Sequence, residues 1–109
     1  MKIEEYLNYT LLFDTYGKLL SNKQSEVMDK FLNLNLSESE LASFTGESRQ
    51  SVHDAVAKAK KQLEKFESEL HIVENMQNAK DELENAKAFL KQNKTNDAIE
   101  IIDRVINNL

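Results

Sequence analysis

Apolar residues recur every three or four positions along most of the chain, which is the period of an amphipathic α-helix. The pattern predicts a first helix over residues 4–20, a second helix after Ser21 and a short third helix over residues 38–44. Proline is absent and glycine occurs only twice, so nothing interrupts long helices and hairpin-rich β folds are disfavoured. The fold class is therefore predicted to be all-α.

Local capping signals set the boundaries of the third helix and of the long helix that follows it. Ser37 is followed three positions later by Glu40, which is the pattern of a capping box. Gly46 can close the third helix in a left-handed conformation, and Ser48 is a candidate cap for the fourth. Two helices separated by so short a turn predict a helix-turn-helix. The apolar seam of the fourth helix comprises Val52, Val56, Ala59, Leu63, Phe66 and Leu70.

The C-terminal third of the chain has the pattern of a helical hairpin. We expect a break near His71, a fifth helix to about residue 92 and a turn at residues 93–96, although one continuous helix through His71 is the alternative. Residues 1–70 are then a helix-turn-helix domain, and residues 71–109 are a C-terminal helical hairpin that serves in oligomerisation. The apolar positions of the last helix are Ala98, Ile99, Ile102, Val105, Ile106 and Leu109.

The apolar surface of this hairpin has two interpretations. A set of apolar residues that leads into the hairpin either packs against the last helix as core or forms a subunit interface. The set is Leu63, Phe66, Leu70, Met76, Leu83 and Leu90. The last helix is apolar on more than half of its circumference, and one facing helix cannot cover so much surface. We therefore expect a homodimer through the C-terminal helices, which would also suit a palindromic target.

Charge restricts where nucleic acid could bind. The 109 residues contain 14 Lys and Arg against 19 Asp and Glu, a formal net charge of −5, so binding requires a local basic patch. Between residues 49 and 65 the balance reverses, with five basic residues against two acidic ones. Turning the apolar seam inward at about 100° per residue directs a second set outward. This set is Gln50, Asp54, Ala57, Lys58, Lys61 and Lys65.

The first turn of the fourth helix is where a helix-turn-helix touches base edges. Arg49 suits guanine and Gln50 suits adenine, each through paired hydrogen bonds. Alternatives remain for each residue. Arg49 could pair with Glu47 or Asp14, and Asp54 could pair with Lys58 or accept a hydrogen bond from a cytosine amino group. The lysines could simply form a solvated face. The predicted nucleic-acid-binding residues are Ser48, Arg49, Gln50, His53, Lys58, Lys61 and Lys65.

Other chemistries find little support. Cysteine is absent, no glycine-rich phosphate loop occurs, and no catalytic set is identified by its spacing, so we expect neither an enzyme nor a cofactor. Glu67, His71 and Glu74 have metal-ligand spacing on one helix face, but no second helix completes a site, so we expect no metal. No apolar segment approaches a membrane span, and the protein is expected in the cytoplasm.

Several short motifs resemble one known family. They are Leu12-Phe13-Asp14, Tyr16-Gly17, Leu36-Ser37, Glu40-Leu41-Ala42, Ser48-Arg49-Gln50 and Val52-His53-Asp54. Together they resemble the YlxM-type helix-turn-helix proteins over about residues 6 to 70. The chain departs from that pattern at Ala55 and around Ala57, where family members carry a larger residue and more basic character.

The resemblance implies a fold similar to the fourth region of bacterial sigma factors and a regulatory role in the signal recognition particle pathway. One hypothesis is a regulator that binds duplex DNA. A second is an accessory protein that contacts the signal recognition particle GTPase and uses its helix-turn-helix only as a scaffold. A third hypothesis combines the two: the protein acts with the signal recognition particle, and its basic residues bind the RNA of the particle rather than duplex DNA.

Overall fold

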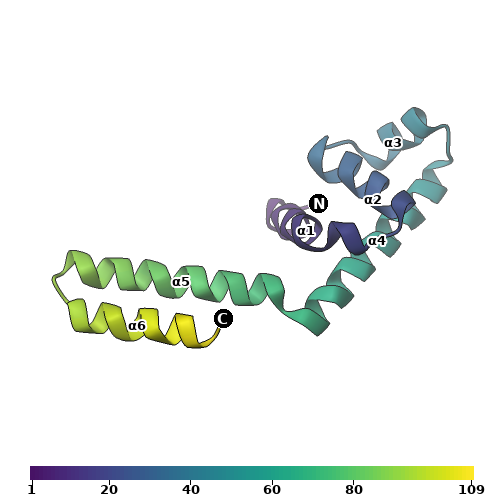
Figure 1. Ribbon diagram of the computed structural model, residues 1–109. Helices are drawn as coiled ribbons and strands as arrows, with labels where there is room; N and C mark the ends of the chain where they lie inside the picture. Colours follow the sequence, from purple (N-terminus) through teal and green to yellow (C-terminus); the bar gives the residue numbers. More distant parts are fainter. The chain divides into compact units, whose positions relative to one another are not determined.

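The computed structural model describes residues 1–109, and every regular element in it is helical (Figure 1). The all-α prediction is therefore confirmed. The chain divides into two compact units, Met1–His71 and Ile72–Leu109. The elements are α1 (Ile3–Tyr16), η1 (Gly17–Leu19), α2 (Asn22–Met28), η2 (Asp29–Asn33), α3 (Glu38–Thr45), α4 (Arg49–Leu70), α5 (Ile72–Lys91) and α6 (Thr95–Asn107).

In the first unit, α1, α2 and α3 all pack against α4 (Figure 1). The apolar seam predicted for α4 faces this core over its first four positions, whereas Phe66 is half-buried and Leu70 is exposed. One seam on one long helix thus organises the whole unit. The buried side chains are Leu12, Tyr16, Leu20, Val27, Met28, Leu32, Leu41, Val52, Val56, Ala59 and Leu63.

The predicted capping residues perform their roles. Ser21, Ser37 and Ser48 each accept a hydrogen bond from the backbone N–H three residues later. Ser37 and Glu40 form the reciprocal capping box, and Gly46 has a φ of +76°. These signals involve only neighbouring residues, which is why the sequence alone reveals them.

Two helix ends differ from the predicted boundaries. α1 ends at Tyr16 rather than at residue 20, and the chain tightens into the 3₁₀ turn η1, where the Leu20 N–H bonds the Gly17 carbonyl at 3.2 Å. Such a turn satisfies carbonyls that a helix end leaves without partners. A Cβ at Gly17 would lie 3.0 Å from the ring of Phe13, so a larger residue would require that ring to shift. α2 continues into η2, a turn of π-helix.

The second unit is a pair of helices, α5 and α6, joined by a short turn (Figure 1). Its buried core is small: Ala86, Ala98, Ile101 and Val105, with Ala79, Phe89 and Ile102 packed around it. An ion pair between Arg104 Nε and Glu82 Oε1, at 3.0 Å, joins the two helices.

The interpretation of Met76, Leu83 and Leu90 as core of this unit is wrong. These side chains are 64%, 46% and 49% exposed, and Ile99 and Ile106 of α6 are exposed as well. The small residues Ala79, Ala86 and Ala98 lie at the contact instead, where they allow the helices to approach closely. The larger apolar residues therefore remain on the surface.

α4 ends at Leu70 because His71 adopts a left-handed conformation with φ of +54°, so the continuous-helix alternative is wrong. Glu67, His71 and Glu74 consequently do not share the face of one helix. None of the helices is both long enough and apolar enough to cross a membrane.

Candidate nucleic-acid interface

The turn between α3 and α4 is held by hydrogen bonds at both of its ends. The Gly46 N–H bonds the Ala42 carbonyl at 3.0 Å, which closes α3. Ser48 Oγ accepts the Ser51 N–H at 3.1 Å, which begins α4. Leu41 and Val52, each about 1% exposed, bury the inner side of the turn. The start of α4 is thus placed rigidly on α3, as a reading helix requires.

Two side-chain contacts between helices reinforce this geometry. Lys23 Nζ of α2 lies 3.2 Å from Glu47 Oε1, which ties the turn to the preceding helix. His53 Nδ1 of α4 lies 2.8 Å from Glu38 Oε2 of α3, which ties the two helices of the motif to each other. Both pairs are partly exposed, so each adds about 0.2–1 kcal/mol and acts mainly on orientation.

Arg49 is the predicted contact residue that the structure leaves most available. Its side chain is exposed in the first turn of α4 and forms no ion pair. The predicted alternative partners do not bind it, since Glu47 contacts Lys23 and Ser51 instead. A guanidinium that is already unpaired loses no internal contact when it binds a base or a phosphate.

Gln50 is partly occupied by an intrahelical contact. Its Nε2 donates to Asp54 Oδ1 at 2.9 Å, so Asp54 pairs with Gln50, and the alternative in which it pairs with Lys58 is wrong. Gln50 and Lys58 each lie four residues from Asp54, and the Gln50 amide is the group that forms the hydrogen bond. The second amide hydrogen and Oε1 of Gln50 remain free, which is what contact with adenine uses.

His53 is less available than predicted because Nδ1 is engaged by Glu38. Its side chain is 57% exposed, so Nε2 can still reach solvent or a ligand. The structure therefore gives His53 a positioning contact between α3 and α4 that the sequence did not reveal, since the partners are 15 residues apart.

The lysines of α4 divide into two groups. Lys58, Lys61 and Lys65 are exposed on the outward face, and none of them forms an ion pair. Lys60 lies elsewhere, with Nζ 4.9 Å from the centre of the Tyr9 ring and 5.4 Å from that of Phe31. Only the first group belongs to a surface that phosphate could approach.

One acid of α4 is also removed from that surface. The hydroxyl of Tyr9 donates to Glu64 Oε1, and this hydrogen bond, together with desolvation, raises the pKa of Tyr9 to about 12. The outward face carries Lys58, Lys61 and Lys65 against the single anion Asp54, and Arg49 flanks this face at the start of α4. With Arg49 included, this surface has a net charge of +3 on a chain of net charge −5.

The chain is similar to one family over nearly its whole length. The sequence model of the UPF0122 family, described as "Putative helix-turn-helix protein, YlxM / p13 like", matches residues 3–105. The match includes α5 and most of α6, beyond the residues 6 to 70 on which the resemblance rested.

Individual relatives agree with this match. A UPF0122 protein of Clostridium kluyveri is 30% identical over 105 residues, which cover 96% of this chain and 95% of that protein. One from Clostridium acetobutylicum is 30% identical over 107 residues, covering 94% and 92%. One from Thermoanaerobacter sp. is 34% identical over 84 residues, covering 77% and 72%.

Proposed function

Because the chain belongs to the UPF0122 family of YlxM / p13-like helix-turn-helix proteins, we propose that it is a regulator that binds duplex DNA through α4. The function is one of binding rather than of catalysis. The observation that carries it is the basic surface of α4, where three exposed lysines of the outward face and the flanking Arg49 have no ion pair. These four cations are accompanied by a single carboxylate on the outward face, Asp54, although acidic residues outnumber basic ones in the whole chain.

The proposal gives each residue a role. Arg49 and Gln50 contact base edges at the start of α4, and Asp54 holds the amide of Gln50 through its 2.9 Å hydrogen bond. Ser48, Lys58, Lys61 and Lys65 position the phosphate backbone without reading sequence. His53 flanks this surface and acts mainly through its contact with Glu38.

The test is fluorescence anisotropy of a labelled mixed-sequence duplex at several salt concentrations. The full chain should bind at micromolar concentration or tighter, with a steep salt dependence, and Arg49→Ala/Lys61→Ala should lose that binding. Lys61→Ala alone should reduce the salt slope by about one.

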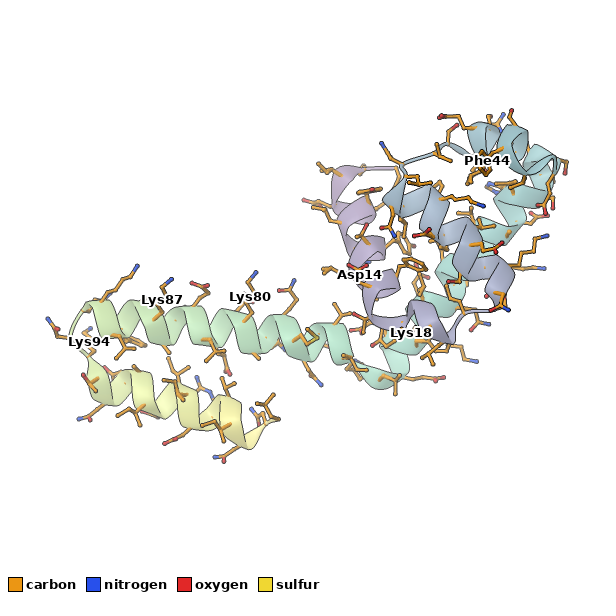
Figure 2. The ribbon with its side chains drawn as sticks, turned by 45° about the horizontal axis from the view of Figure 1, so that its top comes forward. Asp14, Lys18, Phe44, Lys80, Lys87 and Lys94 are labelled. Carbon is orange, nitrogen blue, oxygen red and sulfur yellow. The ribbon has the colours of Figure 1, made fainter.

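The matched control is Lys18→Ala/Lys87→Ala, which removes the same charge at exposed positions outside α4. Lys87 points away from α6 on the surface of α5 (Figure 2). Equal loss of affinity in both double variants would mean that only total charge matters. Absence of binding at about 50 mM salt would refute the assignment to DNA.

A second function is favoured by the acidity around the motif. Asp54 lies on the outward face, while Glu38 and Glu47 flank the turn. These residues suit an accessory protein of the signal recognition particle, a role that the family resemblance implies, with the particle GTPase or its RNA as the partner. Co-elution with the purified GTPase at micromolar concentration would support it, and anisotropy with the particle RNA tests the third hypothesis directly.

We also propose a homodimer through the C-terminal helices, in the cytoplasm where these partners are found. Ile99 and Ile106 of α6 are 49% and 60% exposed, and Met76 of α5 is 64% exposed. Apolar surface of this kind is typical of a subunit interface. Ile106→Glu should shift sedimentation velocity from dimer to monomer, whereas Leu19→Glu, at an equally exposed apolar position of the first unit, should not.

A further inference from the structure

Two rows of exposed apolar side chains lie on one face of the C-terminal hairpin. They are Leu83 and Leu90 of α5, and Ile99 and Ile106 of α6, and each is between 46% and 60% exposed. Each row lies about a quarter of a turn from the buried contact between the helices, in the same sense along its own chain direction. Because α5 and α6 are antiparallel (Figure 1), equal turns bring both rows to one side. We name these four residues the apolar face.

The opposite face of the hairpin is polar. The same helical projection places there a set of exposed residues from both helices. The set is Asn78, Asp81, Asn85, Asp97 and Asn108. The hairpin is therefore amphipathic as a whole, and neither of its helices covers the apolar face of the other.

The two edges of the apolar face carry opposite charges. Lys80 and Lys87 border the row of α5 on the side away from α6 (Figure 2). Asp103 borders the row of α6, about 40° from Ile99 in projection and also on the side away from the other helix. Neither lysine nor Asp103 forms an ion pair within the chain.

The remaining charges of the hairpin do not blur this difference. Glu84 is the acid of α5 that projects nearest to Lys80 and Lys87, and it lies farther round the helix from the apolar face than they do. Arg104, the cation of α6, points to the other side of the hairpin and is paired with Glu82. One edge is thus basic and the other is acidic.

The ion pair between Arg104 and Glu82 fixes which residues of α5 and α6 lie at the same height. Ile99 is level with residue 87, between the two leucines of α5, and Ile106 is level with residue 80, just before them. The two rows therefore alternate in height, as interlocking side chains of packed helices do. Met76 is level with a position beyond Asn107, where α6 ends, and lies outside the interlocking part.

We propose that the apolar faces of two copies stack into a four-helix bundle in which α5 of each copy packs antiparallel on α6 of the other. A two-fold axis parallel to the helices produces this pairing and leaves the heights unchanged, so the isoleucines of one copy interlock with the leucines of the second. The proposal rests on the homodimer proposed above and specifies its geometry.

Charge selects this arrangement over the other symmetric one. With α5 on α6, Lys80 and Lys87 of one copy lie beside Asp103 of the second, and this happens twice in each dimer. Asp103 is level with residue 83, between the two lysines, so either of them can pair with it. A two-fold axis across the helices would instead place α5 on α5, with lysines against lysines, and like charges disfavour that pairing.

Disulfide cross-linking tests which helices meet. The chain contains no cysteine, so introduced thiols report without background. Full-length Leu83→Cys and Ile106→Cys, one of them tagged, are mixed, allowed to exchange subunits and oxidised. The mixture should yield a linked dimer with one chain of each kind. Neither variant alone should do so, because identical positions lie diagonally across the bundle, beyond the reach of a disulfide.

The matched control replaces Leu83→Cys by Asn85→Cys on the polar face, and this mixture should give no linked dimer. A linked dimer of Leu83→Cys alone would mean that α5 packs on α5 and would overturn the proposal. Absence of a linked dimer in the mixture of Leu83→Cys with Ile106→Cys would overturn it too.

Sedimentation velocity tests the charged edges. Lys80→Glu/Lys87→Glu should raise the dissociation constant of the dimer at least about fivefold, and adding Asp103→Lys should restore it. The control Lys2→Glu/Lys18→Glu makes the same change in total charge on exposed residues of the first unit and should shift the constant by less than about twofold. Failure of Asp103→Lys to restore the dimer would count against the arrangement.

Sedimentation of the unchanged chain separates failure of this geometry from failure of the homodimer. A monomer at micromolar concentration would overturn both proposals. A dimer that cross-links through Leu83→Cys alone would overturn only the geometry. Neither result bears on the proposed binding of duplex DNA, because the residues assigned to DNA belong to the first unit.

Discussion

The cap of α4 offers a test that separates the stability of the motif from its binding of DNA. In Ser48→Ala, the Ser51 N–H loses its 3.1 Å acceptor, and the start of α4 has no other side-chain cap. Ser48 is exposed, so water can reach the vacated N–H and limits the loss. The free energy of unfolding should therefore fall by about 1 kcal/mol, the middle of the range for such caps.

This loss is large enough to measure by thermal unfolding. For a unit the size of Met1–His71, about 1 kcal/mol corresponds to a fall in Tm of about 4–8 °C. The assay is circular dichroism at 222 nm with the full chain. Ser48→Gly should cost only a few tenths of this, because glycine is itself tolerated as a cap.

Ser48→Asp completes the design. Aspartate caps as well as serine and favours the positive end of the helix, so the Tm should be retained. The same carboxylate at the DNA surface should nevertheless weaken duplex binding, because it repels phosphate. A Tm unchanged in Ser48→Ala would refute the reasoning on the cap. Duplex affinity unchanged in Ser48→Asp would refute the position assigned to DNA.

Three further predictions follow from burial, protonation and backbone conformation. Leu63→Ala, at a fully buried position, should lower the free energy of unfolding by about 2–5 kcal/mol, whereas Met76→Ala, at a site 64% exposed, should change it by less than about 0.5 kcal/mol in urea titrations. The pKa of Tyr9 is higher in the folded protein, so the hydroxyl contributes fully to stability below pH 10, and this contribution is lost as the pH rises through about 12. Ultraviolet titration of the phenolate should report this pKa, and Glu64→Gln should lower the pKa. Gly46→Ala should cost about 1 kcal/mol although nothing lies within 4 Å of the added methyl, because the strain is in the backbone at φ of +76°; the Tm measures it.

The helix-turn-helix was predictable because its signals are local. Ser37, Glu40, Gly46 and Ser48 act on neighbours within four residues, and the structure confirms each of these caps. The seam of α4 was predictable for a similar reason, since only one of its faces is apolar over the first four positions.

The C-terminal unit was harder to predict because its helices have more than one apolar face. In α5, a stripe through Ala79 and Ala86 competes with one through Met76, Leu83 and Leu90. Periodicity favours the larger residues, whereas close packing of two helices favours the smaller ones. Which of these stripes is buried depends on how closely α6 approaches α5, and the sequence of α5 alone does not determine that distance.

Side-chain partners on the candidate interface were only partly predictable. Asp54 has Gln50 and Lys58 at equivalent helical spacing, so sequence could not decide between them. The contact of His53 with Glu38 joins two helices and requires their packing to be known. Exposure of the predicted lysines, by contrast, follows directly from the seam that faces away from them.

The small core of the C-terminal unit has a consequence for how the protein melts. Four buried side chains and two helices are marginal for independent stability, since chains below about 40 residues usually need a further stabilising element. If this unit self-associates as proposed, its folding and its assembly become one equilibrium. Calorimetry should then resolve two transitions. The one from α5 and α6 should move to higher temperature as protein concentration increases, while the one from the helix-turn-helix unit stays where it is.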